Sequence, residues 1–232
     1  MSTVAIEVFP DKDALARGAA ERIASRLREA PGPRASLGIA GGSTPAATYR
    51  ELRGLLCRWD RVDVWLSDER WVPLDHPDSN GRMAAEELLD HVPCTFHRPR
   101  WAPWLEPEES AAHYEALIRS LHPSDHRPDL ILLGMGEDGH IASLFPDTAA
   151  LAVRRRWYVS NFVPKLDVWR LTATFDILDL ARDVFFLVGG EAKADVLGRV
   201  MGGELFPATR VALGAAPVTW LLDEAAASKL SR

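Results

Sequence analysis

The chain has 232 residues, of which 47% are hydrophobic and 26% charged, and its formal net charge is −6. This ordinary globular composition excludes disordered, collagen-like and coiled-coil proteins, and the length favours one domain over residues 1–232. The acidic balance, without a basic stripe, argues against a nucleic-acid surface, and no apolar stretch approaches the roughly 20 residues that a membrane helix needs.

Hydrophobic periodicity predicts alternating strands and helices in the first half of the chain. Thr44 is expected to cap a helix that begins at Pro45, where the missing proline N–H costs nothing. Ser79 is expected to cap another helix after a loop over residues 68–78. The expected elements are strand 4–9, helix 11–30, strand 36–40, helix 45–56, strand 62–67, helix 80–91 and helix 108–121.

The same alternation continues to the end of the chain. Expected strands cover residues 130–133, 157–161, 170–174 and 184–188, expected helices cover 175–181 and 191–201, and residues 211–213 and 217–227 follow. Because parallel strands need crossover connections that lay helices over them, this order predicts an α/β fold. We expect a three-layer α/β/α sandwich with a mainly parallel, Rossmann-like sheet.

A glycine-rich loop after the apolar run at residues 130–133 carries an ionisable pair, Asp138 and His140. In an open α/β sheet, ligands bind beyond the carboxyl ends of the strands, and the glycines let a ligand approach the backbone. A neutral imidazole can take a proton from water near pH 7, and a carboxylate beside it can fix its tautomer. The pair therefore predicts a general base, His140, with Asp138 as its partner, and a loop histidine that is solvated or bonded to a backbone carbonyl is the alternative.

Two earlier loops should reach the same edge of the sheet. The segment Gly41, Gly42, Ser43 and Thr44 joins a strand to a helix. Its backbone N–H groups suit a phosphate or an oxyanion, although an ordinary tight turn has the same pattern. Asp68 and Arg70 follow the strand at 62–67. The arginine offers a fork of donors suited to phosphate, with a surface ion pair as the alternative.

Lys193 follows the apolar strand at 184–188 and two glycines, so its ammonium either meets a phosphate at a helix start or stays solvated. Arg170 is a weaker candidate of the same kind. Neither a His-x-x-x-His pattern nor a cysteine pair accompanies His140, so no metal site is expected. No partner is apparent for the other histidines, among them His97 and His122.

The two cysteines, Cys57 and Cys94, have no metal-ligand spacing and no small-domain disulfide framework. They fit structural thiols in a reducing compartment. Residues 1–10 lack the charged start and long apolar segment of a secretory leader. We therefore expect a cytoplasmic protein that does not bind a membrane.

Short motifs follow one another along the chain: Gly41-Gly42-Ser43-Thr44-Pro45, Asp68-Glu69-Arg70-Trp71-Val72-Pro73, Asp78-Ser79-Asn80, Gly136-Glu137-Asp138-Gly139-His140, Ser143-Leu144-Phe145-Pro146, and Gly189 with Lys193. In their order and spacing, these motifs resemble the 6-phosphogluconolactonase family over nearly the whole chain. The resemblance implies a fold like that of glucosamine-6-phosphate deaminases, and hydrolysis of 6-phospho-D-glucono-1,5-lactone in the oxidative pentose phosphate pathway. It implies no metal or organic cofactor, a phosphorylated sugar lactone as the partner, and a monomer or small homo-oligomer.

Carried over to this sequence, the resemblance implies that His140 is the general base with Asp138 beside it, and that Arg70 and Lys193 bind the phosphate. The deaminase branch typically has tyrosine after Asp-Glu and Asn-Glu-Pro after the histidine segment, where this chain has Arg70 and Leu144-Phe145-Pro146. Two alternatives remain open: an aldose–ketose isomerase or deaminase, and a sugar-phosphate sensor that binds without turnover.

Overall fold

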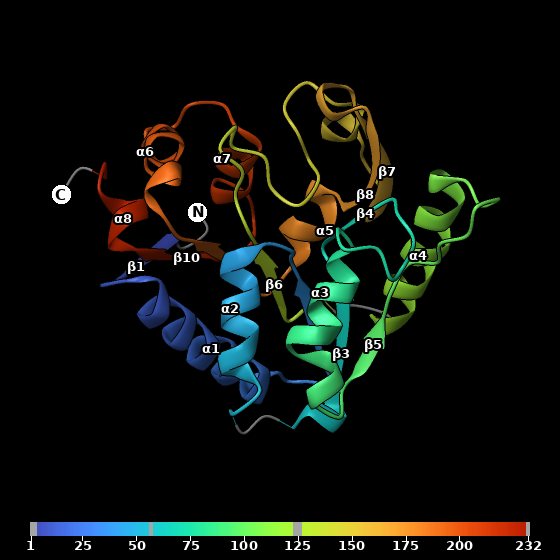
Figure 1. The fold of residues 1–232 in the computed structure, drawn as a ribbon, viewed down its shortest axis with the longest axis horizontal. Coiled ribbons are helices and arrows are strands. Elements are labelled where there is room, and N and C mark those ends of the chain that lie inside the picture. Colours follow the sequence, from blue (N-terminus) through green and yellow to red (C-terminus); the bar gives the residue numbers. More distant parts are fainter. Residues whose placement is uncertain (1–3, 56–57, 123–126, 231–232) are drawn as a thin grey trace.

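The computed structural model describes residues 4–55, 58–122 and 127–230. Its centre is a seven-stranded sheet in which every pairing is parallel (Figure 1). In sheet order, the strands are β1 (Val4–Phe9), β10 (Val218–Asp223), β9 (Val184–Val188), β6 (Leu130–Leu133), β2 (Ala35–Ile39), β3 (Val62–Leu66) and β5 (Thr95–His97). The predicted α/β class is confirmed.

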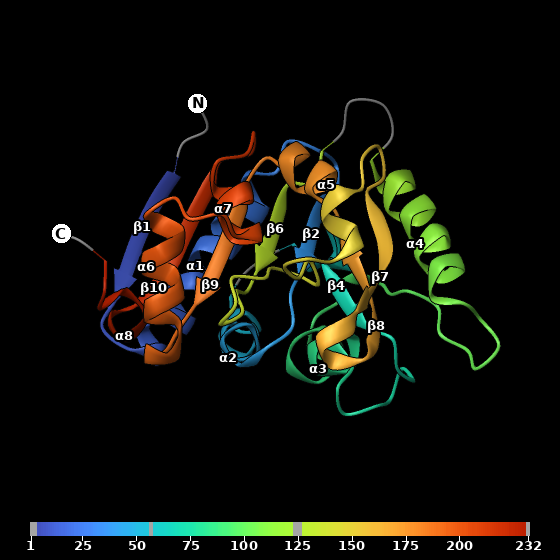
Figure 2. The ribbon, with the colours of Figure 1, turned by 90° about the horizontal axis from the view of Figure 1, so that it is seen from above.

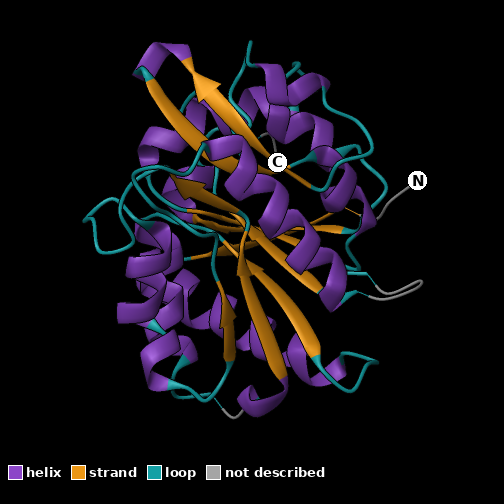
Figure 3. Cartoon of the chain, turned by 90° about the vertical axis from the view of Figure 1, so that its right-hand side faces the viewer, coloured by secondary structure: helices purple, strands orange, loops and turns teal. Residues whose placement is uncertain are grey.

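Helices cover both faces of this sheet, as crossover connections require. One face carries α1 (Lys12–Glu29), α2 (Ser43–Leu52) and α3 (Asn80–Glu87). The other carries α4 (Pro107–Leu121), α5 (Phe175–Leu180), α6 (Ala194–Met201), α7 (Pro207–Ala212) and α8 (Glu224–Ala227). Figure 1 shows α1 and α2 below the sheet and α6 and α7 above it, and Figure 3 shows the strands fanned between the helices. None of these helices has the length and apolar character to cross a bilayer, as far as the described residues go.

The sheet separates two hydrophobic cores, and neighbouring residues of one strand enter different cores. In β6, Leu130 and Leu132 pack against α1 and α2, whereas Ile131 and Leu133 pack on the opposite face. Successive side chains of a strand point to opposite faces. Because helices cover both faces, the strand reads as a continuous apolar run rather than an alternating one.

A second sheet was not expected from the sequence. Three antiparallel strands, β4 (Asp68–Arg70), β8 (Val168–Ala173) and β7 (Tyr158–Val163), form it, and Figure 2 shows them beside α4, far from β1. The expected strands 157–161 and 170–174 belong here rather than to the parallel sheet. β4 was predicted as loop because three residues are too few to show a period of two.

Several predicted boundaries were wrong. Thr44 does not cap a helix: α2 begins at Ser43, its N-cap is Gly42 with a φ of 111°, and no side chain caps it. The expected helix 191–201 begins as a 3₁₀ turn, Glu191–Lys193, and residues 211–213 belong to α7 and its end. Residue 56, the expected end of α2, and Cys57 lie outside the described residues.

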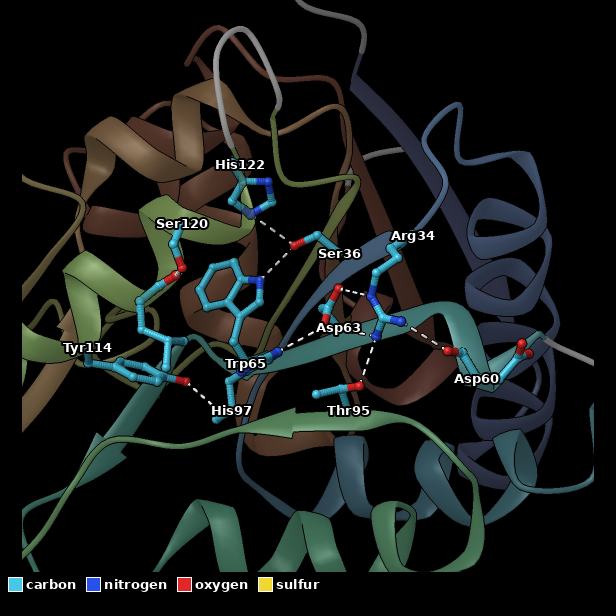
Figure 4. Close-up of polar contacts among 11 residues, drawn as sticks. Arg34, Ser36, Asp60, Asp63, Trp65, Thr95, His97, Tyr114, Ser120 and His122 are labelled. Carbon is cyan, nitrogen blue, oxygen red and sulfur yellow. Dashed lines mark hydrogen bonds and ion pairs between the residues drawn. The ribbon is translucent and has the colours of Figure 1, made fainter.

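Ser36 and Asp63, near the amino ends of β2 and β3, have hydrogen-bond partners that are distant in sequence. Ser36 Oγ accepts a hydrogen bond from Trp65 Nε1 at 3.0 Å and lies 3.0 Å from His122 Nε2 (Figure 4). Asp63 Oδ1 lies 2.9 Å from His97 Nε2. The expectation that these two histidines lack partners was therefore wrong, because residues distant in sequence supply the partners.

Candidate active site

A cavity of about 260 Å³ opens at the carboxyl ends of β2, β3, β6 and β9. This is the edge where an α/β sheet binds ligands. The predicted site residues that line it are Gly41, Gly42, Ser43, Thr44, Asp68, Arg70, His140, Arg170 and Lys193. The structure thus brings together every residue predicted for the site except Asp138, which lies behind His140 and does not line the cavity.

The loop after β2 needs glycine at its first position. A Cβ on Gly41 would lie 1.9 Å from Oδ1 of Asn80, so no larger residue fits without displacing that amide. Gly42 then adopts its positive φ and starts α2 without a side-chain cap. Ser43 and Thr44, the first residues of the helix, line the cavity, and the N-cap provides no side chain to their N–H groups, as is typical of an anion-binding turn.

Asp68 connects three of the loops around the cavity. Its carboxylate accepts hydrogen bonds from Ser143 Oγ at 2.8 Å and from Asn80 Nδ2 at 3.2 Å, and the same amide also donates to the Asp68 carbonyl. The backbone N–H of Ser143 donates to Thr172 Oγ1 on β8. With Asp68 only 7% exposed, these bonds fix the carboxylate in the cavity wall.

The neighbouring Glu69 is not a surface residue, which corrects the surface ion pair considered for this loop. It is 3% exposed and accepts hydrogen bonds from the N–H groups of Arg70, Asn80 and Gly81 and from Ser79 Oγ. Burial raises the pKa of this carboxyl. Glu69 thereby ties the start of α3 to β4 and places Arg70 at the cavity.

Two arginines face each other across the small sheet. Arg70 on β4 is paired in register with Arg170 on β8, and both line the cavity. Like charges directly opposite each other destabilise a sheet. Among the described residues, the buried Nε of Arg170 has no hydrogen-bond partner, and burial, followed by the charge of Arg70, lowers the pKa of Arg170. An anion bound between the two guanidinium groups would reduce their mutual repulsion and give the buried Nε of Arg170 a hydrogen-bond acceptor.

Lys193 adds a third positive charge to the cavity wall. It ends the 3₁₀ turn that follows Gly190, whose φ is 95°. The side chain is 25% exposed, and its ammonium lies 3.8 Å from the exposed carboxylate of Glu137. At that distance in solvent the attraction is weak, so the ammonium can turn to a ligand phosphate at little cost.

His140 is held by two contacts. Its Nδ1 lies 2.5 Å from Asp138 Oδ1, and its ring stacks on Phe145 with centroids 3.9 Å apart. A carboxylate can only accept a hydrogen bond, so a neutral His140 carries its proton on Nδ1. The other nitrogen, Nε2, is then the basic one.

Burial lowers the pKa of His140 from 6.5 to about 4. The positive charges of Lys193, Arg170 and Arg70 act in the same direction, whereas Asp68 acts against them. The imidazole is therefore neutral near pH 7 and has a lone pair for a proton. Its surroundings thus give it the protonation state that a general base needs.

Gly136 makes room for this imidazole. A Cβ there would lie 2.1 Å from Nδ1 of His140 and 2.7 Å from Oδ1 of Asp138. We expect Gly136→Ala to lower kcat by on the order of 10²-fold, because a displacement of about 1 Å at a catalytic group has that effect. Steady-state kinetics and thermal unfolding check this. Gly54→Ala, whose Cβ would meet its nearest atom at 3.8 Å, is the control and should be neutral.

Sequence reasoning gave no role to four residues that shape the site: Asn80, Ser143, Phe145 and Lys165. The first three lie in the quoted motifs, but their contacts are with residues distant in sequence, so spacing does not reveal them. Lys165 belongs to none of these motifs, and its one sequence signal is that it is one of only four lysines in the chain. The described residues contain no group of three or more His, Cys, Asp or Glu side chains placed to hold a metal ion.

The fold and the cavity define an α/β protein of the doubly covered parallel type, with its site at the carboxyl edge of the sheet. The sequence profile of the glucosamine-6-phosphate isomerases/6-phosphogluconolactonase family matches residues 10–220. The chain belongs to this family.

Individual relatives agree over full length. A 6-phosphogluconolactonase of Synechocystis is 37% identical over 97% of this chain and 98% of its own. The solved structure of 6-phosphogluconolactonase from Trypanosoma brucei covers all of both chains with a TM-score of 0.88 at 27% identity. A monomeric glucosamine-6-phosphate deaminase aligns with 97% of this chain and 99% of its own, at a TM-score of 0.81 and 25% identity. The predicted family and deaminase-like fold are confirmed.

Proposed function

We propose that this protein hydrolyses 6-phospho-D-glucono-1,5-lactone to 6-phospho-D-gluconate, with His140 as the base that activates water. One observation carries the proposal: a neutral imidazole and three cationic side chains, those of Arg70, Arg170 and Lys193, line the same cavity. A phosphorylated lactone has an electrophilic carbonyl and a dianionic phosphate at opposite ends. The full-length relatives named 6-phosphogluconolactonase support the same reaction.

In the proposed mechanism, Nε2 of His140 takes a proton from a water molecule as the water oxygen bonds to C1 of the lactone. Charge develops on the carbonyl oxygen, and the N–H groups of Ser43 and Thr44 are the proposed donors to it. The bond between C1 and the ring oxygen then breaks. The ring oxygen takes the proton from His140, which leaves an open-chain acid and the neutral base.

The cations act on the other end of the substrate. Arg70, Arg170 and Lys193 bind the phosphate and so hold C1 at a fixed place relative to His140. The lactone hydrolyses slowly without an enzyme, so a modest acceleration suffices. General base catalysis contributes about 10²- to 10⁴-fold, and positioning adds to it.

Acid release from fresh 6-phosphogluconolactone in a pH-stat, corrected for the spontaneous rate, tests the proposal. Hydrolysis faster than the uncatalysed rate supports it. Ammonia release from glucosamine 6-phosphate without lactone hydrolysis would establish a deaminase instead. Thermal stabilisation by 6-phosphogluconate without turnover would establish a sensor.

In the substrate-free protein, we expect the imidazole of His140 to titrate near pH 4 rather than near its usual 6.5. The base is therefore present above that pH and lost as the pH falls through it. Proton NMR of the ring Hε1 measures the pKa directly, which avoids the titration of the substrate phosphate near pH 6. His140→Gln assigns the resonance.

Lys193→Met tests whether nearby cations lower the pKa of His140, because it removes one of these positive charges. In this variant the titration midpoint of the imidazole should rise. A midpoint at or above 6.5 in the unmodified protein would contradict the expected neutral base.

A further inference from the structure

Lys165 contacts the two residues that hold the imidazole, although it lies outside the parallel sheet. It sits in the turn Pro164–Leu166 between β7 and β8. Its ammonium is paired with Oδ2 of Asp138 and lies 5.0 Å from the centre of the Phe145 ring. Asp138 and Phe145 both contact the ring of His140 as well.

We propose that Lys165 is a positioning residue for the catalytic base: it holds the Asp138 carboxylate so that Oδ1 stays on Nδ1 of His140. The inference rests on the proposed function, because it assigns His140 the role of base. Nothing in it requires Lys165 to touch the substrate, and Lys165 does not line the cavity.

The geometry of the carboxylate supports this role. Asp138 lies in a loop and its side chain is 30% exposed; within this loop the backbone N–H of His140 donates to Oδ1 over a long 3.3 Å, which holds the carboxylate only weakly. With Oδ2 bound to Lys165, Oδ1 is directed to His140. The cation over the face of Phe145 fixes the ammonium from a second side.

The hairpin that bears Lys165 also bears Arg170, five residues further along the chain. One structural unit thus reaches both ends of the proposed substrate: its strand β8 supplies a cation for the phosphate, and its turn holds the partner of the base. A surface ion pair with no such role is the alternative. The Lys165 side chain is 53% exposed, and pairs of that kind contribute little to stability.

The two readings predict different effects of Lys165→Met. If Lys165 positions the base, the variant should fold normally and lose about tenfold in kcat, less than the roughly 10²-fold that a full displacement of about 1 Å at a catalytic group costs, because Asp138 and Phe145 remain. KM should change little, since the phosphate contacts remain. Lys165→Arg should restore much of kcat, because it keeps the charge beside Asp138.

The variant should also change the titration of His140. The charged groups that act on this imidazole are the carboxylates of Asp138 and Asp68 and the cations of Lys193, Arg170 and Arg70. Removing Lys165 leaves Asp138 without its own counter-ion, which stabilises the protonated ring. The pH at which His140 loses its base function should therefore rise.

Two controls separate positioning from a general surface effect. Lys229→Met removes a similarly exposed lysine from its pair with Asp195 and should leave kcat unchanged. In the background of Asp138→Asn, Lys165→Met should have no further effect on kcat, because both act through the same contact. Equal losses in both backgrounds would overturn the proposal.

Nitrogen-15 NMR of His140 decides the question without any assay of activity. In the unmodified protein the Nδ1–H tautomer should predominate, and Lys165→Met should produce a mixture of tautomers. An unchanged tautomer and pKa in Lys165→Met would overturn the role of Lys165 even if the protein hydrolyses the lactone. A lack of lactone hydrolysis with a changed tautomer would refute only the proposed function.

Discussion

His140→Ala is expected to lower kcat for 6-phosphogluconolactone by about 10²- to 10⁴-fold, the usual contribution of a general base. The imidazole is the basic group at the cavity whose neutral form prevails near pH 7, because burial and three nearby cations disfavour its charge. KM should change much less, since the cations that bind the phosphate are not altered. Initial rates in a pH-stat, corrected for spontaneous hydrolysis, measure both constants.

Two further variants guard against a trivial loss of structure. His140→Gln keeps a polar side chain beside Asp138 and should be as slow as the alanine variant, because an amide cannot take up the proton. His113→Ala removes an exposed histidine of α4 and should be neutral. A His140→Ala protein that binds 6-phosphogluconate and turns over at the full rate would remove the proposed base.

Arg70→Leu is expected to raise KM for the phosphorylated lactone by about 10- to 150-fold, with a smaller effect on kcat. A hydrogen bond to a charged group contributes about 1.5–3 kcal/mol, which corresponds to this range. The expected loss of substrate affinity is large because Arg70 and Arg170 lie opposite each other and are proposed to bind the same phosphate. The buried Nε of Arg170 has no hydrogen-bond partner among the described residues, which indicates that an anion belongs there. Arg170→Leu should behave alike.

The unphosphorylated D-glucono-1,5-lactone is the sharpest control for this prediction. The unmodified protein and Arg70→Leu should hydrolyse it at equal rates, because it has no phosphate to lose. Arg22→Leu removes an ion pair between α1 and Glu7 of β1 and should leave the hydrolysis of both lactones unaffected. If Arg70→Leu slowed both lactones equally, the arginine would act on the reacting end or on the fold instead.

Periodicity was sufficient for most of the parallel sheet, because most of its strands are short apolar runs. β6 and β9 were predicted at their observed boundaries for this reason, but the three-residue edge strand β5 was not predicted. The antiparallel sheet was missed, since β4 has only three residues and its partners are about 100 residues further along the chain. Strand pairing at that separation leaves no local pattern.

The sequence by itself determined which groups could do chemistry: an imidazole beside a carboxylate, glycine turns after buried strands, and a few cations in loops. Their order and spacing also determined the family. Only the tertiary structure decided that Arg70 and Arg170 face each other, that Glu69 is buried, and that Lys165 reaches Asp138. The physical reason is that charge state and orientation depend on burial and on neighbours from distant segments, which a local pattern of residues does not specify.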